Sequence, residues 1–131
     1  MKTTLNCALW AALLAALATS AQAAVKDEAN LKLATTSGCM TCHQIEPGAK
    51  GPEGMAPIGP AWKDVAAKYK GQKDAAAKLT HTVLTGSNPY ESHWKGKVSG
   101  LAMPPNAVAI KEADAKQLVK WILGMGAAKK P

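Results

Sequence analysis

The residues best suited to chemistry stand together at positions 39–43, which read Cys-Met-Thr-Cys-His. Two cysteines at this spacing form a redox disulfide, supply half of a zinc site, or bond to the two vinyl groups of one haem. The histidine directly after the second cysteine completes the pattern of covalent haem attachment. A thioredoxin-like site needs a βαβ context that the sequence does not indicate. A zinc site needs further ligands, for which only His81 and His93 remain. We therefore expect one haem, bonded to Cys39 and Cys42.

The neighbouring histidine is expected to bind the iron. His43 is held beside the second thioether and reaches the metal from one face, so it is the expected proximal ligand through one ring nitrogen. Five side chains remain as candidates for the opposite face of the iron: Met55, His81, His93, Met103 and Met125.

Met103 is the favoured sixth ligand because Pro104 and Pro105 follow it. Both prolines fix φ and lack a backbone donor, so they stiffen an extended strap at the point where a side chain must press onto metal. Met125 lies on the apolar stripe of an expected helix and is more simply a core residue. His81 points away from the apolar face of its helix. Met55 and His93 lie in loops, and periodicity does not exclude them.

The N-terminus predicts export. Lys2 precedes an apolar run over 8–18, and Ala-Gln-Ala follows at 21–23. This pattern is typical of a secretory signal peptide over 1–23, and the run is too short to span a bilayer. We expect a mature domain over 24–131, a periplasmic location and the loss of Cys7 with the signal.

The charge pattern predicts an acidic protein partner. The chain has sixteen lysines and nine acids, a formal net charge of +7. The expected mature chain keeps fifteen lysines, which gives +6. Two haem propionates would lower this to about +4. Export argues against nucleic acid, and flexible, strongly hydrated lysines suit brief docking to an acidic redox protein.

Helical periodicity predicts an all-α domain of about four helices. The expected helices cover 27–36, 62–69 with an opening at Pro60, 73–86, and 112–123. Two long loops, 46–59 and 87–106, are rich in glycine and proline. Loops of this length in a small domain usually wrap around something, here the expected haem.

Several stretches resemble the class I cytochromes c, especially the small bacterial carriers of the c-551 and c5 type. The matching pieces are the attachment motif, Ile-Gly-Pro-Ala at 58–61, Met-Pro-Pro-Asn at 103–106 and the last helix with Trp121. The resemblance implies a cytochrome c fold, a His43/Met103 iron site and a hydrogen bond from His43 to the carbonyl of Pro60.

The resemblance also assigns roles outside the iron site. Leu33 and Ala34 should pack against Leu118 and Ile122, where the first and last helices cross. Trp94 resembles a tryptophan that binds a haem propionate, but it lies nine positions before Met103, which is farther than in the family pattern. Simple packing over the haem rim is the rival role for Trp94.

The resulting hypothesis is a non-enzymatic single-electron carrier with no catalytic residue, because an iron closed by two ligands leaves no position for substrate. The alternatives are a dedicated haem subunit of a periplasmic oxidoreductase, with the segment 87–102 as its docking surface, and a peroxidase or gas binder with an open iron. A monomer or a subunit of a small complex is expected. The partners would be dehydrogenases, reductases or oxidases.

Overall fold

The computed structural model describes residues 24–127, so the expected signal sequence over 1–23 lies outside the described residues. The main helices are an N-terminal helix over 24–36, α2 at Trp62–Lys68, α3 at Ala75–Thr85 and α4 at Glu112–Gly124. Three short 3₁₀ helices add η1 at Cys39–Thr41, η2 at Pro52–Gly54 and η3 at Met125–Ala127. Between 24 and 127 the structure holds no β-strand, only an isolated bridge between Lys95 and Val98. The predicted all-α fold is confirmed.

The helix ends follow local chemistry. Glu112 and Asp114 occupy the first turn of α4, where carboxylates complement the positive end of the helix dipole. The N-terminal helix stops before Gly38, whose φ of +76° is costly for any residue with a side chain. One expected boundary was wrong: Pro60 does not open a helix, because α2 begins at Trp62 after an extended Ala61. The Pro60 carbonyl is therefore available to another partner.

The core lies where the N-terminal helix, α2 and α4 meet. Its central cluster contains Ala34, Trp62, Ile110, Ala115 and Leu118. Leu33 and Ile122 pack against the same cluster, so the predicted contact between the first and last helices is confirmed. Many of the buried apolar residues are alanines, which let backbones approach closely but bury little apolar area each.

Two side-chain hydrogen bonds fasten the N-terminal helix to α4. Gln117 Nε2 donates to Asn30 Oδ1 at 2.8 Å, and Trp121 Nε1 donates to Asp27 Oδ1 at 2.8 Å. Asn30 is fully buried, so its bond to Gln117 replaces water that the amide has lost.

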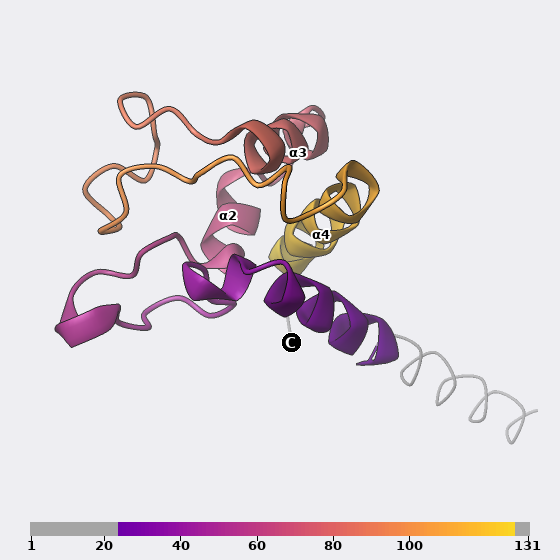
Figure 1. Cartoon of the computed structure of the whole chain (residues 1–131), viewed down its shortest axis with the longest axis horizontal. Helices are drawn as coiled ribbons and strands as arrows, with labels where there is room; N and C mark the ends of the chain where they lie inside the picture. Colours follow the sequence, from indigo (N-terminus) through magenta and orange to yellow (C-terminus); the bar gives the residue numbers. More distant parts are fainter. Residues whose placement is uncertain (1–23, 128–131) are drawn as a thin grey trace, which may run out of the picture.

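Both long loops extend to the same side, away from the N-terminal helix and α4 (Figure 1). Two backbone hydrogen bonds join the loops: Ser99 N donates to Pro57 O at 2.9 Å, and Gly100 N donates to Ile58 O at 3.0 Å. Among the described helices, none has both the length and the apolar character needed to cross a membrane. The helices thus form a frame, and the loops form one connected wall beside it.

Candidate haem site

The two cysteines flank a single tight turn. Cys39 opens η1, and its carbonyl accepts hydrogen bonds from Cys42 N at 3.3 Å and His43 N at 3.1 Å. Both cysteines are free thiols and half-buried. Burial raises the pKa of the Cys39 thiol, partly offset by a backbone hydrogen bond. The turn therefore presents two free sulfur atoms and one imidazole from five consecutive residues.

The ring of His43 is fixed by two neighbours. Its Nδ1 lies 2.8 Å from the carbonyl oxygen of Pro60, and the ring stacks on Trp62 with centroids 6.0 Å apart. A carbonyl only accepts, so Nδ1 carries the proton and Nε2 has a free lone pair. Burial lowers the pKa of His43, and the Pro60 contact opposes this in part. A neutral imidazole with Nε2 available is the form that binds metal.

Gly59 lets the segment before α2 pack closely against the turn that carries Cys42 and His43. Its N–H donates to Cys42 O at 2.8 Å. A Cβ at this position would lie 2.9 Å from Cε1 of His43 and 3.0 Å from Nδ1. The backbone of the segment before α2 thus packs directly against the imidazole, and this close contact requires glycine at position 59.

The strap that carries Met103 is tied to the end of α3. Ser87 Oγ accepts from Met103 N at 2.8 Å, and Ser87 N donates to Met103 O at 3.0 Å. At Gly86, a Cβ would lie 3.0 Å from Met103 O and 3.1 Å from Pro105. Met103 itself is half-buried. This reciprocal pair holds its backbone in one position.

Asn106 fastens the other end of the strap. Its backbone N–H donates to Val83 O at 3.1 Å, and its side-chain Nδ2 donates to Pro104 O at 2.6 Å. Its carbonyl then accepts from Ala109 and Ile110 and starts the turn toward α4. Asn106 therefore has a structural role in the strap.

The other candidate ligands occupy less suitable positions. Met55 is 53% exposed, and His81 and His93 are also exposed, as expected for His81. Met125 packs against the core cluster, as its place on the apolar stripe predicted. Met103 is thus the candidate that combines partial burial with a braced backbone.

Trp94 lies in a tight turn of the loop between α3 and α4. Its N–H donates to Ser92 Oγ at 3.2 Å, and its ring meets His93 edge to face with centroids 4.8 Å apart. Lys97 Nζ lies 5.8 Å from the ring centroid, within cation–π range. Local desolvation lowers the pKa of His93, and the charges of Lys68 and Lys97 lower it further. The half-buried indole therefore has positive charge beside it, which suits an anionic group.

Sequence reasoning missed the residues that brace the site. In the sequence, Gly86 and Ser87 indicate only the end of a helix, and Gly59 belongs to the Ile-Gly-Pro-Ala motif without a predicted function of its own. Their pairing with Met103 and His43 is long-range, so no local pattern shows it. The one available signal was the position of a serine directly after a helix-ending glycine.

These parts fit covalent haem. Two free thiols of one turn could attach a haem, and an imidazole with Nε2 available and a braced thioether could bind its iron. The half-buried side chains of Met40, Val83 and Leu84 pack against the core cluster from the attachment turn and from α3. An all-α frame carrying such a site defines a c-type cytochrome.

Comparisons with known proteins agree with this class. Residues 31–126 match the family described as Cytochrome c. Cytochrome c-551 of Allochromatium vinosum is 42% identical over 97 residues, which are 74% of this chain and 86% of that protein. Cytochrome c-552 of Nitrosomonas europaea is 38% identical over 96 residues, 73% and 78% of the two chains. The crystal structure of wild-type Nitrosomonas europaea cytochrome c552 covers 72% of this chain and 98% of its own, with a TM-score of 0.57 and 38% identity.

The chain belongs to the cytochrome c family, and the resemblance to class I carriers of the c-551 type is confirmed. Its cofactor is one covalent haem c, which supplies reversible one-electron chemistry at iron. The Cys-x-x-Cys-His motif fits its attachment. The protein is an electron carrier, in line with its relatives. Redox proteins are therefore its partners.

Proposed function

We propose that this chain is an exported carrier whose haem iron is bound by His43 and Met103. Cys39 and Cys42 would form the two thioethers, Pro60 would orient His43, and Trp94 would contact a propionate. The observation that carries this proposal is the pair of hydrogen bonds between Met103 and Ser87. Met103 N donates to Ser87 Oγ at 2.8 Å, and Ser87 N donates to Met103 O at 3.0 Å. Such bracing places a side chain reproducibly, as a metal ligand requires.

Two features of the site would favour the reduced state. A thioether ligand stabilises ferrous iron, and an apolar surrounding disfavours the extra charge of the ferric form. The His43 ring, held by Pro60 and Trp62, has little freedom to reorient when the charge changes. We therefore expect a positive reduction potential and no substrate at the iron.

We further propose that residues 1–23 direct export and that the mature domain, 24–131, works in the periplasm as a monomer or a subunit of a small complex. Its partners would be acidic dehydrogenases, reductases or oxidases. A net charge of +6 before the propionates would steer them at long range. Electrons would leave near Cys39, Met40 and Lys50.

Replacement of Met103 tests the iron site. In the holoprotein, Met103→Ala should remove the sulfur-to-iron charge-transfer absorption and let carbon monoxide bind the reduced form. Met55→Ala is the matched control, because Met55 is an exposed loop methionine that should leave both readouts unchanged. If Met103→Ala keeps the native spectrum, another residue is the ligand.

A second function is favoured by one surface. The segment 87–102 exposes Tyr90 at 84% and Leu101 at 85%, which is unusual for large apolar side chains. A dedicated haem subunit of a periplasmic oxidoreductase would use this segment for docking. Stable co-purification with a larger subunit, abolished by Tyr90→Ser with Leu101→Ser, would support this role over the free carrier.

A further inference from the structure

An unbroken line of aromatic rings runs from His43 to the protein surface. The His43 ring stacks on Trp62 with centroids 6.0 Å apart and an interplanar angle of 24°. Trp62 meets Trp121 edge to face with centroids 5.6 Å apart. Trp62 is only 3% exposed, whereas Trp121 is partly exposed. The line therefore begins at an iron ligand and ends where a partner has access.

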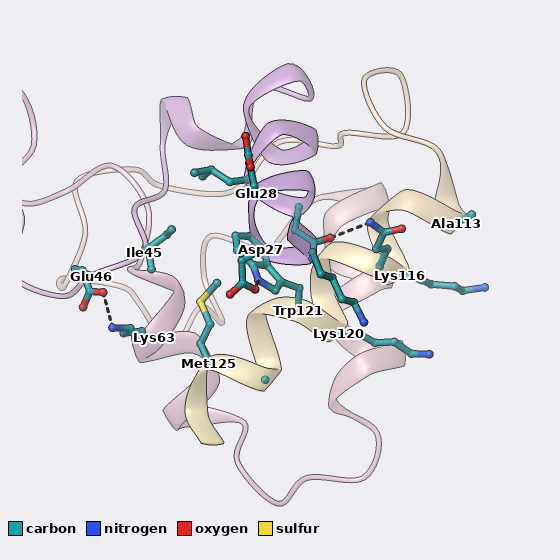
Figure 2. Close-up of a pocket in the computed structure, with 15 residues that line it drawn as sticks. Asp27, Glu28, Ile45, Glu46, Lys63, Ala113, Lys116, Lys120, Trp121 and Met125 are labelled. Atoms are coloured by element: carbon teal, nitrogen blue, oxygen red, sulfur yellow. Dashed lines mark hydrogen bonds and ion pairs between the residues drawn. The ribbon is translucent and has the colours of Figure 1, made fainter. Parts of the chain in front are cut away.

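Trp121 opens into a cleft between the N-terminal helix, α4 and the segment 45–46. Figure 2 shows Trp121 beside Asp27 in this cleft, with Ile45 and Met125 close by. The indole N–H of Trp121 donates to Asp27 Oδ1 at 2.8 Å. This bond ties the ring to a second helix, so the outer end of the line has a fixed position.

We propose that Trp62 and Trp121 form a second electron route between the haem and the cleft, and that an acidic redox protein docks there. This inference rests on the carrier function proposed above. Contiguous π systems couple a donor and an acceptor better than saturated side chains of the same size. The residues at this cleft are distinct from Cys39, Met40 and Lys50, so the protein would have two ports.

The electron balance of the route is simple. One electron leaves ferrous iron, which becomes ferric, and the redox centre of the docked protein is reduced by one electron. The reverse transfer reduces the haem. Trp62 and Trp121 provide coupling and undergo no net oxidation or reduction, and no proton or bond changes.

The charges around the cleft favour an acidic partner. Its lining carries four lysines and three acids. Within the chain Glu46 pairs with Lys63, Lys116 pairs with Glu112, and Asp27 accepts from Trp121. Of the charged lining residues, Lys26, Lys120 and Glu28 have no such partner in the described part of the chain, which leaves two cations against one acid. Lys120 lies on α4, one position before Trp121, and lines the same cleft.

A photoactive ruthenium complex on an introduced cysteine tests the route. In the mature holoprotein, Lys120→Cys carries the label at the cleft, and Lys78→Cys on α3 carries it outside the cleft. Flash-induced electron transfer to or from the haem is then timed with Trp121 present, or replaced by leucine or phenylalanine. Leucine should slow transfer from position 120 severalfold, and phenylalanine should restore most of the rate. The rate from position 78 should not change, nor should the reduction potential.

Each outcome has a separate meaning. If Trp121→Leu slows neither label or slows both equally, the aromatic route is wrong while the carrier function stands. If the haem exchanges no electron with either label, the carrier function itself fails.

Docking is tested without electron transfer. Addition of a polyglutamate peptide should shift the NMR signal of the Trp121 indole N–H, and Lys120→Glu should weaken this shift. Lys78→Glu is the charge-matched control on another helix and should have little effect. An indole signal that stays in place, or that responds equally in both variants, overturns docking at the cleft.

Discussion

Gly59 shows how one missing side chain places His43, the proposed iron ligand. A Cβ at this position would lie within 3.0 Å of two ring atoms of His43, and also 3.0 Å from Cys42 O. The neighbours are a backbone carbonyl and a ring fixed by Pro60 and Trp62, so none of them yields easily. Conformational freedom is not the reason for this glycine, since the close approach alone requires it.

Gly59→Ala should therefore displace His43 and destabilise the holoprotein by about 1–3 kcal/mol, as overpacking does in general. Denaturant unfolding measures the free energy, and the haem absorption spectrum reports the ligand. Gly124→Ala is the matched control, because no atom lies within 4 Å of its Cβ position. It should be neutral or stabilise α4 by up to about 1 kcal/mol. Equal free energies of unfolding for the two variants would contradict the proposal that the close contact with His43 requires Gly59.

Ser87 holds the backbone of Met103, the proposed ligand on the opposite side of the iron. Ser87→Ala removes the 2.8 Å bond from Met103 N to Oγ but keeps the bond from Ser87 N to Met103 O. We expect the free energy of unfolding to fall by about 1 kcal/mol, the usual contribution of one hydrogen bond. The sulfur-to-iron absorption should weaken, and exogenous cyanide should bind the ferric form more tightly.

The matched control is Ser99→Ala in the same loop, whose Oγ lies 3.4 Å from Pro57 O and contributes little. Stability alone does not distinguish bracing of the ligand from general packing. The prediction fails if cyanide affinity changes equally in the two serine variants.

At the scale of elements, helix positions were largely predictable from the sequence, and their mutual fastening was not. Periodicity placed α3 and α4 within about two residues of their observed ends, because their apolar stripes face one core. Trp121 was expected on such a stripe, but its bond to Asp27 joins residues 94 positions apart. A polar pair of this separation leaves no periodic signal.

The hydrogen bond between Gln117 and Asn30 allows the contribution of such a polar pair to stability to be measured. Asn30 is fully buried, and its Nδ2 has no hydrogen-bond partner within the described part of the chain. Gln117→Leu would remove the donor to Asn30 Oδ1, leaving a buried amide oxygen unsatisfied as well. We expect a loss of about 1–3 kcal/mol in the free energy of unfolding.

Gln72→Leu is the control for that change. Its Nε2 donates to Lys68 O at 3.0 Å in an exposed position, where water replaces the bond. The expected effect is within about 0.5 kcal/mol. Similar losses in both variants would show that the crossing of the N-terminal helix and α4 does not depend on this pair.

At the scale of the whole molecule, we expect the haem to act as part of the core. The buried apolar side chains include Trp62, Ile110, Leu118 and Val119, and otherwise consist of alanines. The two loops that form one connected wall contain no long helix, so we expect their order to depend on the haem. The attachment motif predicted the cofactor, but the hydrogen bonds that join Pro57 to Ser99 and Ile58 to Gly100 needed the folded chain.

Removal of the haem should therefore unfold more than the site. The double variant Cys39→Ser, Cys42→Ser retains His43 and Met103 but has no thiols for attachment, so it is isolated without covalent haem. A covalently attached haem remains on the chain in the folded and unfolded states, so it stabilises the fold through the apolar contacts that it makes only in the folded state. We expect far-UV circular dichroism to show a large loss of helix and thermal unfolding to lose its cooperativity. The holoprotein in the same buffer is the reference. If the haem-free chain unfolds cooperatively at the same midpoint, the alanine-rich helical core is sufficient by itself, and the loops do not need the haem to hold their positions.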